Sequence, residues 1–216
     1  AVIPVFAVGR AQAVLHAIAQ LKINDSLPKG LPVFLDSPMA VHTTHLFEKH
    51  IGDHRLSPHD AHALTRGATM VNSTDESKAL ASRHGPMVIL SASGMATGGR
   101  VLHHLEHHLG KKRNMVILTG YQAPGTRGAT LASGSETLRL HGREIAVHAE
   151  VVQLQSASAH ADAGQLLDWL RSMPSRPDQV YVVHGDLAAS DALRSRIERE
   201  LGLRALVPEH GACWPC

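Results

Sequence analysis

Short, continuously apolar runs alternate with longer amphipathic stretches through the first two thirds of the chain. The runs at 2–8, 31–35, 86–93 and 114–119 are typical of strands that are buried on both faces of a parallel sheet. Strands that alternate with helices imply right-handed crossovers. The pattern therefore predicts an α/β fold in which helices cover both faces of a parallel sheet.

Two of the amphipathic stretches have clear helical spacing. One runs from Arg10 to about Lys22, and the other follows Arg100. The apolar positions expected to face the core are Ala11, Val14, Leu15, Ile18 and Leu21 in the first stretch and Val101, Leu102, Leu105 and Leu109 in the second. Between 41 and 85 the pattern loosens into shorter helical pieces rich in histidine.

A change of period marks the end of this first domain. The alternating runs Leu138–Leu140 and Ile145–Val147 flank the segment His141–Arg143, which predicts a β-hairpin that leads into an extended strand. We place the boundary near the start of that strand, and therefore expect two domains, 1–150 and 151–216.

Residues that could contact a ligand follow several of the predicted strands. Gly9 permits a tight turn that places Arg10 at a helix start, with its guanidinium available to a phosphate. The glycine-rich segment 94–99 offers backbone N–H groups and a helix start to a phosphodiester. Tyr121 has a ring on which a base could stack, and Arg127 could contact a phosphate.

Asp36 ends the second apolar run, directly before a good helix start made by Ser37 and Pro38. Helix capping is a sufficient explanation for Ser37 and Pro38. A carboxylate at the end of a strand is expected to point toward the crevice at the sheet edge. The functional hypothesis for Asp36 is that it orients a basic neighbour there, and a purely structural role is the alternative.

The helix after Arg100 carries two pairs of histidines at i, i+4 spacing. His104 and His108 lie on the apolar side and are expected to be partly buried, whereas His103 and His107 should face water. Packing and solvation explain all four side chains. Affinity for nickel or zinc at this helix would be adventitious.

Composition indicates a compact module without a membrane span. The chain has 216 residues, 44% of them hydrophobic, and lacks both an apolar run of the roughly 20 residues needed to span a bilayer and a signal peptide. We therefore expect a cytoplasmic protein. A net charge of +2 is too small to indicate nucleic-acid binding by itself. The only cysteines, Cys213 and Cys216, form a single C-x-x-C motif, which provides too few ligands for a structural zinc site.

Two histidines near the end of the chain close apolar runs. They are His160, in the segment 155–162, and His184, in the segment 180–186. We expect both imidazoles at the carboxyl ends of strands, where open α/β sheets place their chemistry. The aspartates that follow, Asp162 and Asp186, are expected to cap helices, the first of them in a capping box with Gln165.

These segments resemble the β-CASP branch of the metallo-β-lactamase superfamily, which contains metal-dependent nucleases of RNA processing and DNA repair. The resemblance covers nearly the whole chain. The matching segments are Ile3–Gln12, Asp36–Ala40, Ser91–Arg100, Ser158–Asp162 and His184–Gly185. It implies a β-CASP domain that clamps RNA, followed by the C-terminal strands and helices of a metallo-β-lactamase αββα core.

The resemblance also implies roles for individual residues. His184 would be a zinc ligand, His160 would protonate the leaving oxygen, and Ser158 would position a phosphate oxygen. Ser93 and Gly94 match a segment that lies in the cleft between the two domains of the family. With Arg10 and Arg127 they would contact the substrate, which we expect to be single-stranded RNA.

The main metal cluster of the family, a His-x-His-x-Asp-His loop, is absent from this sequence. We therefore expect the chain to be the C-terminal part of a longer protein that binds two zinc ions, which this chain alone would not hold stably. The implied function is zinc-dependent hydrolysis of RNA phosphodiester bonds in RNA processing or degradation, and the chain alone should be inactive. Endonuclease and exonuclease action both stay open, as does a homodimer.

Two other functions compete with this one. A paralogue that has lost its metals would bind nucleic acid as a scaffold, and an unrelated α/β domain would bind a small phosphorylated ligand. The histidine at 184 favours the RNA branch of the family over its DNA-repair members. Within the RNA branch, Ser91–Met95 favours relatives of the cleavage and polyadenylation nuclease over the ribonuclease J type.

Overall fold

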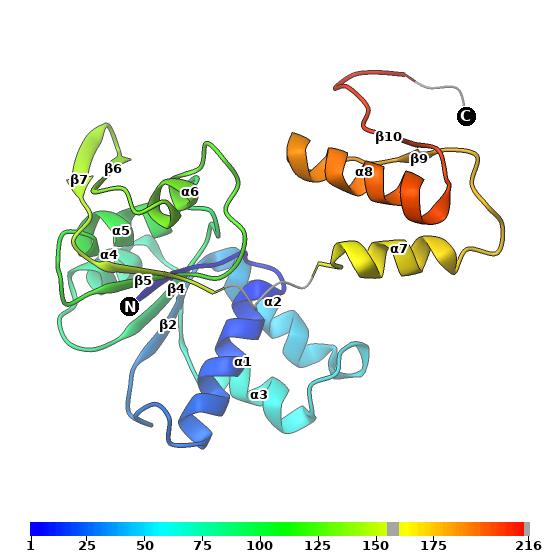
Figure 1. Cartoon of the computed structure of the whole chain (residues 1–216). Coiled ribbons are helices and arrows are strands. Elements are labelled where there is room, and N and C mark those ends of the chain that lie inside the picture. The colour runs from blue at the N-terminus through cyan, green and yellow to red at the C-terminus, as the bar shows by residue number, and fades with distance from the viewer. Residues whose placement is uncertain (155–159, 214–216) are drawn as a thin grey trace. The chain divides into compact units, whose positions relative to one another are not determined.

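The structure is a computed structural model that describes residues 1–154 and 160–213 (Figure 1). The chain divides into two compact units, 1–158 and 159–216. Within the described residues, no helix combines the length and the apolar character needed to cross a lipid bilayer.

The first unit is built on a six-stranded parallel sheet, which confirms the predicted fold class. In order across the sheet the strands are β3 (Thr69–Val71), β2 (Val33–Asp36), β4 (Val88–Ser91), β1 (Val2–Pro4), β5 (Met115–Leu118) and β8 (Glu150–Gln153). Residues of the central strands are almost completely buried, as their continuous apolar runs predict. The short edge strand β3 was not predicted, because three residues give no recognisable apolar run.

Helices cover both faces of this sheet (Figure 1). One face carries α1 (Arg10–Ile23), α2 (Pro38–Lys49) and α3 (Pro58–Arg66), and the other carries α4 (Thr74–Ser82), α5 (Val101–His108) and α6 (Arg127–Ala132). A short 3-10 helix, Ile51–Asp53, follows α2. Ser37 accepts a hydrogen bond from the Ala40 N–H and Pro38 is the first residue of α2, so the predicted helix start is confirmed.

The first strand and helix depart from the hydrophobic pattern in two places. The strand predicted over 2–8 ends at Pro4, because the chain turns at 7–9 to enter α1 and leaves Val8 64% exposed. On α1, Ala11, Leu15 and Ile18 are buried as predicted, but Leu21 is 43% exposed. Apolar periodicity identified the buried face of the helix but not how far along the helix the core extends.

The predicted hairpin is confirmed as β6 (Thr137–Leu140) and β7 (Arg143–Ala146). Its two-residue turn is His141-Gly142, and both residues have positive φ, 46° and 81°. The strand after it, β8, was expected to begin the second domain. It pairs with β5 instead, with Val151 opposite Val116, so the sheet of the first unit continues to Gln153.

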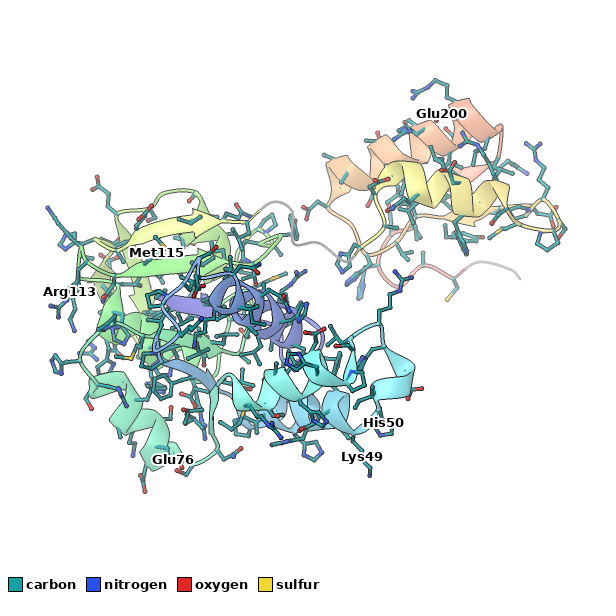
Figure 2. All side chains as sticks on the ribbon, turned by 90° about the horizontal axis from the view of Figure 1, so that it is seen from below. Lys49, His50, Glu76, Arg113, Met115 and Glu200 are labelled. Carbon is teal, nitrogen blue, oxygen red and sulfur yellow. The ribbon has the colours of Figure 1, made fainter. Side chains whose placement is uncertain are left out.

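The second unit packs two helices with a two-stranded parallel sheet. Its elements are α7 (Ala163–Arg171), β9 (Val180–Tyr181), α8 (Leu187–Leu201) and β10 (Ala205–Leu206). A small core joins them, made by Leu167, Leu170, Val182, Ile197, Leu203 and Ala205. The outer side of α8 carries i, i+4 ion pairs, including Arg196 to Glu200 at 2.8 Å (Figure 2).

The two predicted helix caps differ in outcome. Asp162 and Gln165 form the expected capping box at the start of α7, with 2.8 Å from the Gln165 N–H to the Asp162 carboxylate. Asp186 stands at the N-cap position of α8, but its side chain makes no capping hydrogen bond. The prediction that the Asp186 side chain caps this helix is therefore wrong, although α8 does begin directly after Asp186 as predicted.

Candidate functional site

The segments that leave the carboxyl ends of the central strands contact one another at one edge of the sheet. The Val5 N–H donates to the Ser91 carbonyl at 3.0 Å, and the Thr119 hydroxyl donates to the Pro4 carbonyl at 3.3 Å. On the far side of β5, the Gln153 amide donates to the Gly120 carbonyl at 3.0 Å. In a parallel sheet all of these ends share one edge, so the loops predicted to contact a ligand do gather in one region.

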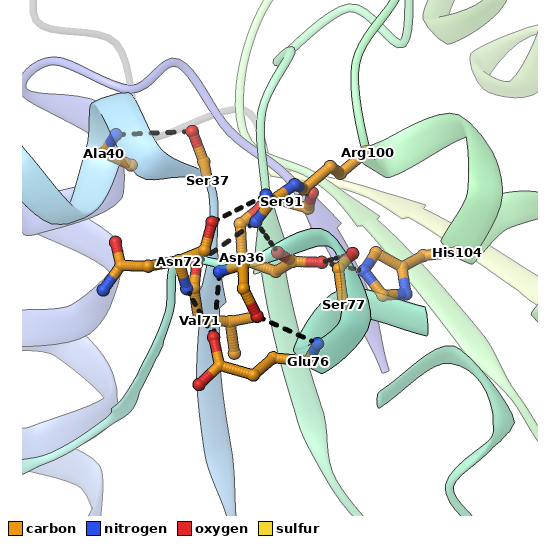
Figure 3. A network of polar contacts seen from close by, with 11 residues as sticks. Asp36, Ser37, Ala40, Val71, Asn72, Glu76, Ser77, Ser91, Arg100 and His104 are labelled. Atoms are coloured by element: carbon orange, nitrogen blue, oxygen red, sulfur yellow. Dashed lines mark hydrogen bonds and ion pairs between the residues drawn. The ribbon is translucent and has the colours of Figure 1, made fainter. Parts of the chain in front are cut away.

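A buried ionic network ties this edge to the helices α4 and α5 (Figure 3). One carboxylate oxygen of Asp36 accepts from Arg100 Nη1 at 2.8 Å. The other accepts from the Ser77 hydroxyl at 2.5 Å and lies 2.6 Å from His104 Nε2. Burial alone would raise the pKa of Asp36, but the hydrogen bonds from His104, Ser77 and Arg100 outweigh it and hold the pKa below its ordinary value.

Asp36 therefore does hold basic neighbours, although it does not face an open crevice. Its side chain is 0% exposed, because α4 and α5 close over the end of β2. Arg100 also donates to the carbonyls of Val71 and Asn72, at 3.3 and 2.7 Å. The network thus fixes the end of the glycine-rich segment against the end of β3.

The identities of the basic partners of Asp36 were not predicted from the sequence. His104 was assigned to ordinary packing, and Arg100 was noted only as the end of a motif. A usable signal was present, since a buried acidic residue requires a buried or half-buried basic partner. His104 is the histidine that follows the apolar face of its helix most closely, and it is 0% exposed.

Ser93 and Gly94, both predicted to bind a ligand, already make contacts within the protein. The Ser93 hydroxyl lies 3.0 Å from the Thr97 hydroxyl and accepts from the Thr97 N–H at 3.0 Å. Gly94 is buried beside Phe6, and a Cβ at position 94 would lie 2.7 Å from the Phe6 ring. Glycine is therefore required at 94 by packing, whatever ligand the segment binds.

The two predicted phosphate-binding arginines are in different situations. Arg10 begins α1 as predicted, next to Gly120, and within residues 1–154 and 160–213 its guanidinium makes no hydrogen bond or ion pair. Arg127 begins α6, and its guanidinium donates to backbone carbonyls of Arg139, at 2.9 Å, and Thr97, at 3.2 Å. Arg10 keeps its full hydrogen-bonding capacity for a ligand, whereas Arg127 already joins α6 to β6 and to the glycine-rich segment.

A polar hollow of about 600 Å³ lies beside Arg127. Thr97, Thr126, Thr130, Thr137, Arg139 and Glu144 contribute to its lining. Tyr121, the predicted stacking residue, is 58% exposed on the segment that follows β5.

The two motif histidines, His160 and His184, both belong to the second unit and are exposed. His184 does not directly follow a strand as predicted, because β9 ends at Tyr181, and the residues just before His160 lie outside the described part of the chain. Ser158 lies outside the described residues. His184 has a φ of 64°, a left-handed conformation that is uncommon for residues other than glycine and often marks a functional position.

The described residues do not complete a zinc centre around His184. A zinc ion takes three or four protein ligands. Among residues 1–154 and 160–213, no group of three ligand-type side chains includes His184 or His160. The described part of this chain therefore does not gather around His184 the remaining ligands of the zinc centre that the resemblance implies.

Comparison with protein families identifies both parts of the chain. A model of the Beta-Casp domain matches residues 11–131, which is more than half of the chain. The chain belongs to the β-CASP family. A second model, the RNA specificity domain of Zn-dependent metallo-hydrolases, matches residues 144–208. The resemblance drawn from the motifs is thus confirmed, and the second match begins before β8.

Curated relatives agree with this assignment. The chain is 38% identical over 191 residues to Ribonuclease TTHA0252 of Thermus thermophilus, covering 85% of this chain and 42% of that protein. It is 31% identical to an RNase J-like protein of Methanocaldococcus jannaschii, covering 99% and 49%, and 28% identical to Integrator complex subunit 11 of Gallus gallus, covering 97% and 34%. The chain therefore spans half or less of the length of these relatives.

Proposed function

We propose that the protein containing this chain is a zinc-dependent ribonuclease that hydrolyses phosphodiester bonds of single-stranded RNA in RNA processing or degradation. The observation that carries this proposal is the ordered match of two family models along one chain, the second of them an RNA specificity domain. A relative with 38% identity is named a ribonuclease. We expect the 216-residue chain by itself to be inactive.

In this proposal the first unit binds the sugar-phosphate backbone of the RNA. Arg10 is the principal phosphate contact, because its guanidinium stands at the carboxyl edge of the sheet without a partner among the described residues. Ser93 and Gly94 shape the segment beside it, and Arg127 lines the polar hollow. Backbone contacts of this kind bind RNA with little dependence on its sequence.

Two histidines of the second unit are proposed to act on the phosphodiester. His184 would serve as one zinc ligand, and His160 would donate a proton to the leaving oxygen, a task that histidine performs more often than other side chains. Ser158 would position a phosphate oxygen. The left-handed backbone of His184 supports a role beyond folding, because another residue would reach the same turn with less strain.

Cleavage of a fluorescent single-stranded RNA by the full-length protein tests this function. We expect cleavage that stops when a chelator removes zinc and returns when zinc is restored. The competing function is a scaffold that binds RNA without cutting it. RNA binding with no cleavage by zinc-loaded protein would favour the scaffold and overturn the nuclease.

A further inference from the structure

Three side chains that commonly bind transition metals meet where the β6–β7 turn lies against α5. His103 and Glu106 are one helical turn apart on α5, and His141 is the first residue of the hairpin turn. His141 Nδ1 lies 2.9 Å from a Glu106 carboxylate oxygen, and the rings of His103 and His141 stack with centroids 4.6 Å apart. In the described part of the chain, these three are the only such group whose ligand atoms all lie within 4.8 Å of one another.

The two elements that carry the group are held in place independently of it. Leu138 and Leu140 of β6 are buried in the same core as Leu102 and Leu105 of α5. Packing therefore sets the distance between the helix and the hairpin turn. Because the ligands sit on supported elements, little ordering is needed when an ion binds.

The residue at the first turn position is unusual. His141 has a φ of 46°, a conformation in which glycine, asparagine and aspartate are the favoured residues of two-residue hairpins. An imidazole at this position gains no local hydrogen bond of the kind that an asparagine would make. Its ring is directed instead onto Glu106 and His103.

We propose that His103, Glu106 and His141 bind one divalent first-row transition metal ion, with water as the remaining ligand. Zinc is the ion that we expect. Two imidazoles and one carboxylate are a donor set used by zinc, whereas magnesium and calcium prefer oxygen ligands throughout. Ligand atoms around a tetrahedral zinc ion with bonds of about 2.1 Å lie about 3.4 Å apart. Binding would therefore require these side chains, two of them exposed, to move closer together than the 4.8 Å limit within which their ligand atoms now lie.

Arg143 forms an ion pair with the other carboxylate oxygen of Glu106, and the site can retain that pair. The metal would bind the Glu106 oxygen that now faces His141, in place of the proton between that oxygen and His141 Nδ1. Arg143 would orient the carboxylate from its outer side. Arg143 is 71% exposed and can also move aside. An ion here would join the hairpin turn to α5, and none of its three ligands is a residue that the family resemblance assigns to zinc.

Zinc titration of the purified, chelator-stripped protein against a chromophoric competitor tests the site. We expect His141→Asn and Glu106→Gln each to lose one equivalent of binding or to weaken it by about tenfold or more, since even the loss of an outer partner costs about 10- to 100-fold. Asparagine suits the positive φ at 141, so the hairpin is kept. The matched control is His107→Gln, an exposed histidine of the same helix outside the group, which should titrate like the unaltered protein.

Imidazole ¹⁵N resonances provide a site-specific readout. Zinc added at less than one equivalent should shift the His103 and His141 resonances together and leave that of His107 in place. Circular dichroism of the metal-free variants reports whether they fold, and Glu106→Gln decides the question if His141→Asn does not. Unchanged titrations for the folded variants, or resonances of His103 and His141 that do not respond, would overturn the proposal. Neither result depends on ribonuclease activity.

Discussion

His104 Nε2 lies 2.6 Å from the Asp36 carboxylate, and both side chains are completely buried. This contact joins the end of β2 to the middle of α5, and Arg100 pairs with the other oxygen of the same carboxylate. A single acidic residue thus connects a strand end, a helix and the end of the glycine-rich segment. The stability of this sheet edge should depend strongly on that carboxylate.

Asp36→Asn should lower the free energy of unfolding by about 3–5 kcal/mol, because removing one partner leaves buried basic groups uncompensated. Urea denaturation of the two proteins measures the difference. Asp53→Asn is the matched control, since Asp53 pairs with His50 at an exposed position and should contribute little. A loss for Asp36→Asn no larger than that for the control would show that the buried network does not stabilise the fold.

The contribution of Asp36 should also depend on pH. Its pKa is lowered in the folded protein, so the unfolded state takes up the proton first as the pH falls. The stabilisation is complete above the ordinary value of 3.8 and decreases as the pH falls toward the lower folded value. The difference between the original protein and Asp36→Asn should therefore shrink below about pH 3.8, and a difference that stays constant there would contradict this account.

A second pH effect should come from His108. Burial, followed by the positive charges of His104 and Lys111, lowers the pKa of His108 from 6.5 to about 4. Between about pH 6.5 and about pH 4, His108 is protonated in the unfolded state but not in the folded state. The free energy of unfolding should therefore fall as the pH drops through this range. His108→Gln should flatten this part of the profile in urea denaturation, whereas His107→Gln, at an exposed position, should leave it unchanged.

Arg10→Ala should weaken binding of single-stranded RNA to the full-length protein to the same degree for every sequence. Loss of one phosphate contact should reduce the slope of log K against log salt by about 0.7. Arg113→Ala is the control, because Arg113 is exposed just before β5 and so lies at the opposite edge of the sheet (Figure 2). If Arg10→Ala changed the preference between RNA sequences and left the overall affinity unchanged, this result would contradict the phosphate contact and indicate that Arg10 recognises bases.

His160→Ala and His184→Ala should both reduce cleavage by the full-length protein but differ in metal content. Loss of a proton donor should lower the rate by about 10²- to 10⁴-fold with zinc retained. Loss of a ligand should lower the zinc content itself. Cleavage assays together with elemental analysis of the dialysed variants measure both effects, and equal zinc loss in the two would refute the proposed division of roles.

Much of the fold follows from local patterns in the sequence. Continuous apolar runs identified the central strands, and helical periodicity identified the buried side of α1. Local chemistry also placed the N-cap at Ser37, the capping box at Asp162 and the hairpin turn at His141. These features depend on residues a few positions apart, so a single sequence contains all the information that they need.

Tertiary structure decided what depends on contacts between distant residues. The strand β8 has the local pattern of an extended segment, and only its pairing with β5 assigns it to the first unit. Asp36 and His104 are 68 positions apart, and the burial that makes their contact energetically important arises when α4 and α5 close over β2. The group of His103, Glu106 and His141 likewise forms because the hairpin packs against α5, a contact that periodicity cannot predict.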